Sequence, residues 1–259
     1  MKMRSHPVQS LLREARGAAA QAATAASDVN DRFGEHRAGY SPFDIFQWIS
    51  QDARESFLRA ARQRHFPDGS RIYTQSEPGD AMYRIVCGSI RMSVIRDDGR
   101  EALHSMLEAG SCFGICSMLD GAPRHHTTTA HGDVDVQVLR RDACEQLRLE
   151  HPTFGEGLIR HMSRHTRLLC EYFASSTLDE LPRRVALRLL MAHSKVITGN
   201  KTRLIVRLSQ GEIALMVGAS RQAVNKVLQR FQEDGLISLE YGSVLVEDIQ
   251  RLQSVTSDF

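Results

Sequence analysis

The 259-residue sequence has no run of the roughly 18 consecutive apolar residues that a membrane-spanning helix needs. Its first residues, Met1–Pro7, carry positive charges, but no apolar stretch follows them as it does in a secretory signal. The five cysteines, an odd number, lack the spacing of a disulfide framework and are expected to be reduced thiols. These absences predict a cytoplasmic protein with no membrane partner.

Charge of one sign is not in excess over the whole chain, because 33 Lys and Arg face 31 Asp and Glu. The asymmetry is local. Between Lys201 and Arg230 six basic residues face the single acid Glu212, a local charge of +5. Contact with nucleic acid requires such a basic stretch, although a short cluster of charge also occurs on an ordinary solvated surface.

Composition and length fit a globular protein with room for two domains, since 42% of the residues are apolar and 25% are charged. Residues 1–40 are rich in Ala and Arg and contain few large apolar side chains, so they predict a disordered tail. Apolar residues between 43 and 58 indicate two short helices that lead into the first folded domain.

Residues 41–150 predict a β-roll, or jelly roll, that acts as a sensor or effector domain. Gly88, Gly99 and Gly110 recur every eleven residues and indicate one turn after each strand, and the clearest hairpin is expected at Asp97–Arg100. The expected strands cover residues 72–73, 81–86, 90–95, 102–107 and 134–139.

Residues 151–178 predict one long helix, because no proline interrupts the chain between Pro152 and Pro182. One stripe steps by four and three residues, the spacing of a two-stranded coiled coil, and predicts dimerisation through Leu158, Met162, His165, Leu169, Tyr172 and Ser176. A second stripe is expected to pack on the β domain, at Ile159, Leu168 and Phe173. The polar residues in the first stripe leave open the alternative of a buried helix in a monomer.

Residues 179–259 carry the most informative pattern, which is two capped helices followed by a hairpin. Ser209 and Glu212 match a capping box, Gly218 breaks the first helix, and Ser220 caps the second. The run that follows alternates and turns at Tyr241–Gly242, as the wing of a winged helix does.

The outward face of the second helix predicts contact with double-stranded DNA. It presents Arg221, Gln222, Asn225, Lys226 and Gln229. Arg pairs with guanine, Gln or Asn pairs with adenine, and Lys and a helix N-terminus hold phosphate. Small capped helical hairpins also occur in proteins that never touch DNA, but the local positive charge favours the DNA-binding interpretation.

The order of these parts resembles the cyclic-AMP receptor protein and fumarate-nitrate reductase regulator (Crp/Fnr) family of bacterial transcription factors. The resemblance covers residues 43–252 and is most specific in Ile85–Ile90, in Phe113–Gly114 with Arg124 ten residues on, and in Gly218–Lys226. In that family a β-roll binds an effector, a long helix dimerises and a winged helix binds a palindromic promoter site. The resemblance implies an α+β, homodimeric transcription regulator that is not an enzyme, with RNA polymerase as a further partner if it activates.

The resemblance also implies which residues form the sites. DNA contacts are expected from Ser209, Ser220, Arg221, Gln222, Asn225 and Lys226. The effector pocket is expected to comprise Gly114, Ile115, Cys116, Arg124, His125, Leu169 and Cys170. Many relatives have Glu at the position of Gln222, and the amide suits adenine whereas a carboxylate suits the cytosine amino group.

The expected pocket departs from that of relatives that bind cyclic AMP. Those relatives have Glu, an Arg-Ser pair and Thr-Ser, whereas this chain has Ile115, Arg124-His125 and Leu169-Cys170. Each polar group left unsatisfied in a buried pocket costs about 1 to 3 kcal/mol. Cyclic AMP is therefore not the expected effector, and Arg124 is expected to hold either another anion or a carboxylate of the chain itself.

Other site chemistries are weighed against this interpretation. An iron–sulfur cluster is not expected, because only Cys112 and Cys116 are close in sequence. A haem or metal site is an alternative, since His161 and His165 have metal-ligand spacing. Cys116 and Cys170 are expected to be packed and inert rather than redox switches.

Two rival functions are also left open. The first is a metal-dependent enzyme on a cupin-like β-barrel, and its candidate ligands are His104, His125, His126 and His131. This interpretation leaves the winged helix unexplained. The second is a regulator of the same fold that needs no effector.

Overall fold

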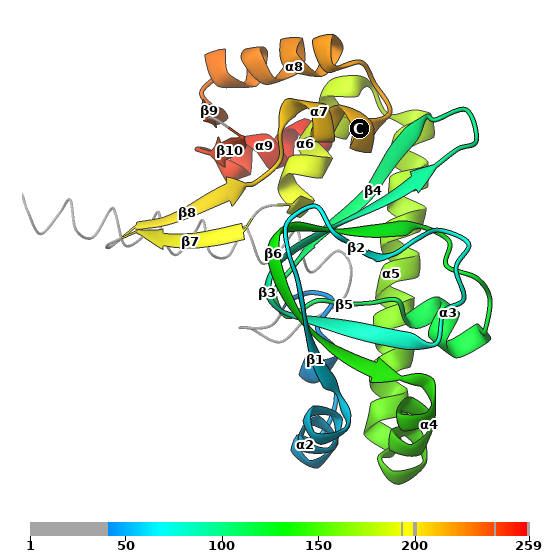
Figure 1. Ribbon diagram of the computed structural model, residues 1–259. Helices are drawn as coiled ribbons and strands as arrows, with labels where there is room; N and C mark the ends of the chain where they lie inside the picture. The colour runs from blue at the N-terminus through cyan, green and yellow to red at the C-terminus, as the bar shows by residue number, and fades with distance from the viewer. Residues whose placement is uncertain (1–40, 193, 199–200, 241, 258–259) are drawn as a thin grey trace, which may run out of the picture. The chain divides into compact units, whose positions relative to one another are not determined.

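The computed structural model describes residues 41–192, 194–198, 201–240 and 242–257 (Figure 1). The tail expected at residues 1–40 lies outside them. The described residues up to Ala174 form one compact unit and those from Ser175 onward form another. Over these residues, no helix is both long enough and apolar enough to cross a membrane.

The first unit is an antiparallel β-roll flanked by short helices. Its elements are the 3₁₀ helix η1 (Ile45–Gln47), α2 (Gln51–Ala60), β1 (Arg62–Phe66), β2 (Arg71–Tyr73), β3 (Ala81–Ile95), β4 (Glu101–Glu108), β5 (Cys112–Phe113), α3 (Ile115–Asp120), β6 (Thr127–Arg140), α4 (Arg141–Glu150) and the start of α5 (Pro152–Leu178). The central sheet runs in the order β1-β6-β3-β4, with β2 paired to β6 and β5 paired to β3.

The turn that the sequence predicts at Gly88 is wrong. Gly88 does not end a strand but lies inside β3, where the pairing with β6 shifts register. Its φ of +84° and the 2.3 Å that would separate a Cβ from the carbonyl oxygen of Asp133 explain why glycine stands there. The hairpin at Asp97–Arg100 is present, closed by hydrogen bonds from the Arg96 N–H to the Arg100 carbonyl and from the Gly99 N–H to the Arg96 carbonyl.

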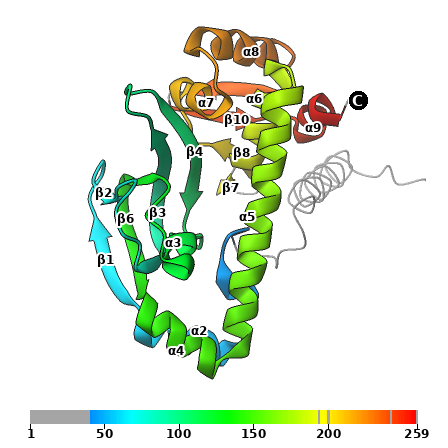
Figure 2. The same ribbon diagram turned by 90° about the vertical axis from the view of Figure 1, so that its right-hand side faces the viewer.

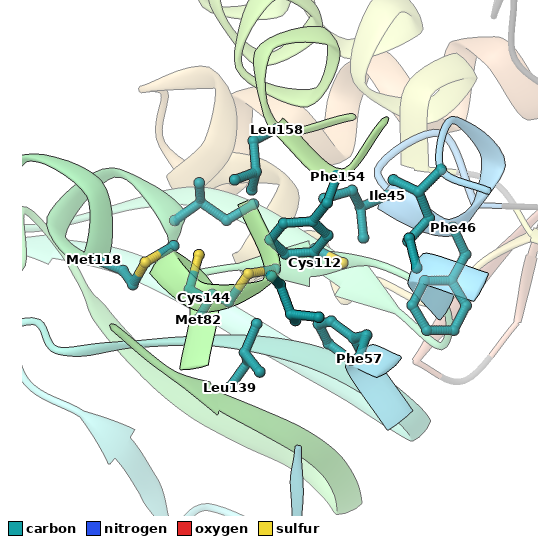
Figure 3. Packing of buried hydrophobic residues seen from close by; sticks show 14 residues of the cluster. Ile45, Phe46, Phe57, Met82, Cys112, Met118, Leu139, Cys144, Phe154 and Leu158 are labelled. Atoms are coloured by element: carbon teal, nitrogen blue, oxygen red, sulfur yellow. The ribbon is translucent and has the colours of Figure 1, made fainter. Parts of the chain in front are cut away.

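A hydrophobic core joins the flanking helices to the sheet (Figure 3). Phe57 of α2 and Phe154 of α5 are fully buried, and they pack with Met82 and Leu139 of the sheet. At about 25 cal/mol per Å² of apolar surface, burial of such side chains stabilises the unit by roughly 1.5 to 3 kcal/mol each. This core fixes where α5 lies against the β-roll.

The first half of α5 turns a different face to the β-roll from the one expected. Leu158 is 3% exposed and belongs to the core cluster, and Met162 packs against it. Ile159 is 68% exposed and does not pack on the sheet. The predicted dimer stripe is therefore wrong at Leu158, because a helix turns about 100° per residue and a shift of one position moves a stripe to a neighbouring face.

The rest of the two predicted stripes divides between buried and exposed positions. Leu168 is buried, as predicted, whereas Phe173 is exposed. Leu169 is 41% exposed and Tyr172 is half-buried. Figure 2 shows the first half of α5 running beside α3.

The second unit combines a helical hairpin with a small antiparallel sheet of order β7-β8-β10-β9. The pair β9 and β10 is the predicted wing, whereas β7 and β8 are not predicted by the sequence. Its elements after α5 are α6 (Leu181–Ala192), β7 (Ser194–Thr198), β8 (Lys201–Val206), α7 (Gln210–Val217), α8 (Arg221–Glu233), β9 (Ile237–Glu240), β10 (Ser243–Val246) and α9 (Ile249–Ser257).

Candidate functional site

The helical hairpin of α7 and α8 is set by local hydrogen bonds at its caps. Ser209 accepts a hydrogen bond from the Glu212 N–H at 3.2 Å, and the Glu212 carboxylate accepts one from the Ser209 N–H at 2.8 Å. The predicted capping box is thus present. Gly218, at φ +66°, ends α7 in the left-handed region. Ser220 starts α8 by accepting a hydrogen bond from the Ala223 N–H at 3.1 Å.

Helix α8 separates an apolar face from a polar one. Val224, Leu228 and Phe231 are buried. The opposite face exposes Arg221, Gln222, Lys226 and Gln229, with Asn225 half-buried. The sequence from Arg221 to Gln232 contains no acid, so this surface combines positive charge, amide groups and a helix N-terminus.

Neighbouring elements hold α8 at both ends. The Arg184 guanidinium of α6 donates to the carbonyl of Val217 at 2.8 Å, where α7 turns toward α8. At the other end, the Leu239 N–H of β9 donates to the side chain of Gln232 at 3.0 Å. The wing therefore follows α8 directly, although Tyr241 at its tip lies outside the described residues.

The β-roll unit holds a second candidate site, a small cavity between the sheet, α3 and α5. Apolar side chains such as Phe43, Phe113 and Leu168 form much of its wall. None of the described residues that line it is Asp or Glu.

Arg124 is the buried cation of this cavity. It is 3% exposed, and its Nη1 and Nη2 donate to the carbonyls of Gly114 and Ala81, both at 2.7 Å. Its guanidinium carbon lies 4.4 Å from the centre of the Tyr73 ring. In the described part of the chain no carboxylate lies within 4 Å of it. The expectation of a structural carboxylate partner is therefore wrong.

Five histidines lie close together, on β4, just before β6 and on α5, and four of them, all but His104, line the cavity. Ring centres are 6.0 Å apart for His104 and His126, 5.6 Å for His104 and His165, and 6.5 Å for His161 and His165. His125 lies 4.3 Å from His126. We call these five residues the histidine cluster.

Burial favours the neutral form of the four histidines that line the cavity. It lowers the pKa of His126 to about 3. The positive charge of Arg124, and that of His125 or His104 when either is protonated, lowers this pKa further. Burial likewise lowers the pKa of His161 to about 3. The pKa values of His125 and His165 are lowered by the same cause. These four residues therefore supply uncharged N–H donors and acceptors rather than cations.

Comparison with known proteins decides the family. Residues 63–151 match the cyclic nucleotide-binding domain and residues 183–255 match the Crp-like helix-turn-helix domain. The chain is 34% identical over 210 residues to a CRP-like cAMP-activated global transcriptional regulator of Mycobacterium tuberculosis, covering 80% of this chain and 94% of that protein. The chain belongs to the Crp/Fnr family of transcription regulators. It is accordingly a DNA-binding regulator with an effector domain.

Further relatives agree with this assignment. A cyclic AMP receptor protein of Thermus thermophilus is 26% identical and covers 82% of this chain and 95% of its own. The structure of FixK2 from Bradyrhizobium japonicum superimposes with a TM-score of 0.67 at 19% identity, over 75% of this chain and 96% of that one, and it supports the fold. The homologues are transcription regulators and not enzymes, so the cupin-like enzyme alternative is wrong.

The cavity of this Crp/Fnr regulator brings together most of the expected pocket residues. Gly114, Ile115, Cys116, Arg124 and His125 all line it. The predictions for Leu169 and Cys170 need correction, because both are exposed on α5 and neither lines the cavity. The rotation of the helix brings Leu168, Met162, His165 and His161 to the cavity instead.

The structure also shows the environment of two cysteines and of the candidate metal ligands. Burial raises the pKa of the Cys116 thiol, which fits an inert residue, whereas Cys170 is exposed and not packed as predicted. His104, His125 and His126 lie together, but His131 is exposed on β6 away from them. Among the residues with described positions, no group of three His, Cys, Asp or Glu is arranged to hold a metal ion.

Tyr73, His161 and Phe43 belong to the cavity without having been expected there. The sequence gives no local pattern for such a convergence, because Tyr73 lies on β2, Phe43 precedes η1 and His161 lies on α5. The spacing of His161 and His165 by four residues was the one available signal, and it indicated only that both share a helix face.

Proposed function

We propose that this protein is a homodimeric, sequence-specific regulator that binds palindromic promoter sites through α8 and whose DNA affinity is set by an effector in the β-roll cavity. We place it in the cytoplasm with DNA as its partner. The observation that carries the proposal is the exposed face of α8, where Arg221, Gln222 and Lys226 are exposed and the sequence from Arg221 to Gln232 contains no acid. The roles of Ser209 and Ser220 are then to cap the helices and to offer hydroxyl groups to phosphate.

Two copies are proposed to pair along α5. The exposed apolar residues Ile159 and Phe173 are two heptads apart, and Leu169 adds to this surface. Cys170 is exposed between them. This stripe replaces Leu158, Met162 and His165, which face their own β-roll.

Cyclic AMP is proposed not to be the effector, although the Mycobacterium tuberculosis relative carries cAMP activation in its name. Where relatives that bind it place a Glu, this cavity has the buried and apolar Ile115. The cavity wall also carries His125 beside Arg124 in place of Ser. The polar groups of the nucleotide would then be buried without partners.

The proposed DNA contact is tested by the salt dependence of binding to a random-sequence duplex, followed by fluorescence anisotropy. The Lys226→Ala variant should lower the slope of log affinity against log salt by about one per subunit, because one phosphate contact is lost. Arg251→Ala on α9 is the matched control, and its slope should equal that of the unmodified protein. Equal slopes for Lys226→Ala and Arg251→Ala would refute the role of α8.

The same titration tests the exclusion of cyclic AMP. Adding the nucleotide should leave the affinity for DNA unchanged. A clear gain of affinity in its presence would show that the cavity accepts it after all.

A further inference from the structure

Three imidazole rings form a column that joins the β-roll to α5. His104 of β4 lies between His126, which comes just before β6, and His165 of α5. Its ring centre is 6.0 Å from that of His126 and 5.6 Å from that of His165, and the ring planes are only 5° and 13° apart. His161, one turn earlier on α5, extends the contact to Phe43, whose ring centre is 5.9 Å away. This part of α5 therefore meets the β-roll through side chains that ordinarily titrate near neutral pH.

The buried rings have no place for a second proton. The Nδ1 atoms of His126 and His161 have no hydrogen-bond partner among the described residues, and both side chains are 3% exposed. The Tyr73 hydroxyl lies 2.7 Å from Nε2 of His126, and a hydrogen bond joins His161 to the backbone of Phe43. A neutral imidazole carries one N–H, whereas a protonated one carries two. Protonation would therefore bury an N–H group without an acceptor in each ring.

The groups around His161 and His165 add positive charge and little negative charge. None of the described carboxylates lies within 4 Å of His126, His161 or His165. Added protons would therefore repel the buried guanidinium of Arg124 and one another. The titratable and charged side chains that surround the two rings on α5 are Asp44 before η1, Tyr73 of β2, His104 of β4, Cys112 of β5, Cys116 and Asp120 of α3, Arg124, His125 and His126 before β6, and Arg164 of α5 itself.

The two acids in this set do not offset that charge. Asp44 is already paired with Arg84 of β3, at 2.7 Å. Asp120 raises the pKa of His125, but burial and the charge of Arg124 keep that pKa below its usual value. A proton on either ring of α5 would therefore remain without a counter-charge while the helix is packed.

Two of the rings belong to α5 and move with it. Phe154 and Leu158 hold the start of α5 in the hydrophobic core, so a separation of this helix from the β-roll concerns the turns that follow. His161 and His165 lie on those turns. His126 stays with the β-roll, because its partner is Tyr73.

We propose that the histidine cluster makes this protein a sensor of acid, in which mild acidification separates the turns of α5 around His161 and His165 from the β-roll. The protons come from the solvent and bind the two rings once these leave the cavity. A ring that is neutral when packed and able to bind a proton when released favours the released form as pH falls. The consequence for DNA rests on the proposed function, because α5 also carries the proposed pairing surface, and the released form is expected to bind DNA more weakly.

Amide hydrogen exchange of the full chain, read by mass spectrometry and corrected for the intrinsic pH dependence of exchange, measures the opening of residues 159–169. Between pH 7.5 and pH 5.5 the opening constant should rise about 10-fold from His161 alone, because its pKa is about 3 when packed and about 6.5 when exposed. His165 should add to this rise. Residues 81–86 of β3, which include the fully buried Met82 and Ile85, are the reference. At pH 5.5 their opening constant should stay at least about 10-fold below that of α5.

Matched substitutions isolate the rings. His161→Phe keeps an aromatic ring against Phe43 but binds no proton, so it should reduce the ratio of the α5 opening constants at the two pH values about 10-fold. A general loss of stability cancels in this ratio. His165→Phe, at a half-buried position, should also reduce the ratio and carries the same test if His161→Phe does not fold. His131→Phe, at an exposed position on β6, should leave the ratio unchanged.

Three results would overturn the proposal. The first is an α5 opening constant that is the same at both pH values. The second is a ratio in His161→Phe and His165→Phe equal to that of the unmodified chain. The third is equal opening of α5 and β3 at pH 5.5, which would mean that acid unfolds the whole unit rather than releasing the helix.

The regulatory role is tested by the affinity for a DNA duplex at pH 7.5 and pH 5.5, at constant ionic strength. The unmodified chain should lose about 3-fold in affinity, which corresponds to release of α5 in about two-thirds of the molecules, whereas His161→Phe should lose less than about 1.5-fold. If α5 opens as described but both chains lose affinity equally, the acid-labile contact stands and its regulatory role is refuted. If the unmodified chain does not bind DNA at pH 7.5, the proposed function fails and the exchange result is unaffected.

Discussion

Acidification should destabilise the β-roll unit through its buried histidines. His126 and His161 each have a pKa of about 3 in the folded chain, against about 6.5 for an exposed histidine in an unfolded one. In both cases burial is the first cause. A histidine whose folded pKa is depressed is protonated more readily when the chain unfolds, so folding stability falls as pH drops from about 6.5 toward about 3.

The magnitude follows from the difference between the two protonation equilibria. A pH of 5 lies about 1.5 units below the pKa of about 6.5 of a histidine in the unfolded chain. Protonation stabilises the unfolded state by about 1.4 kcal/mol per unit, which is about 2 kcal/mol for each histidine. The folded histidine gains almost nothing there, since its pKa is lower still. Together the two residues should remove about 4 kcal/mol of unfolding free energy between pH 7.5 and pH 5.

Trp48, the only tryptophan, reports on this unit alone, because it lies between η1 and α2. Urea unfolding followed by its fluorescence at both pH values gives the two free energies. His161→Asn should reduce the difference by about 2 kcal/mol, whereas the exposed His131→Asn should not. If His161→Asn shows the same loss of stability on acidification as the unmodified chain, the buried-histidine reasoning is wrong.

Three further outcomes are expected. Phe57→Ala, at a fully buried position, should destabilise the β-roll unit by about 3 to 5 kcal/mol in the same Trp48 assay, and a loss below about 1 kcal/mol would contradict the packing described. Ser220→Ala removes the cap of α8 and should lower the unfolding free energy of the second unit, measured by thermal unfolding, by about 1 kcal/mol. Ser220→Gly should lower the same free energy by only about 0.3 kcal/mol. Oxidation should cross-link two chains through Cys170 if α5 pairs in parallel; Cys170→Ser should abolish the product, and persistence of the product would place the contact elsewhere.

The parts of the fold that depend on neighbouring residues in sequence are predictable. The caps at Ser209 and Ser220 arise within three residues of the helix start, and both are confirmed. The hairpin at Asp97–Arg100 and the apolar face of α8 are equally local. These local features are therefore enough to predict the DNA-binding unit from sequence.

The parts that failed depend on partners far along the chain. Gly88 reads as a turn in sequence, but the close approach of Asp133 makes it a bulge inside β3. The predicted dimer stripe on α5 is displaced by about one position. The buried face of α5 is decided by its packing against α2, α3 and the sheet, which are far away in sequence. The histidine cluster draws its members from β4, from the segment before β6 and from α5, and no spacing in one segment reveals it.

The central claim, recognition of a specific DNA site by α8, is tested most directly by selecting bound duplexes from a random pool with the unmodified protein and with Gln222→Ala. The account predicts a palindromic consensus for the unmodified chain, with its half-sites about one helical turn, 34 to 36 Å, apart. Gln222→Ala should lose preference at one base position in each half-site and keep the rest. A consensus without two-fold symmetry, or one that Gln222→Ala leaves unaltered at every position, would contradict the account.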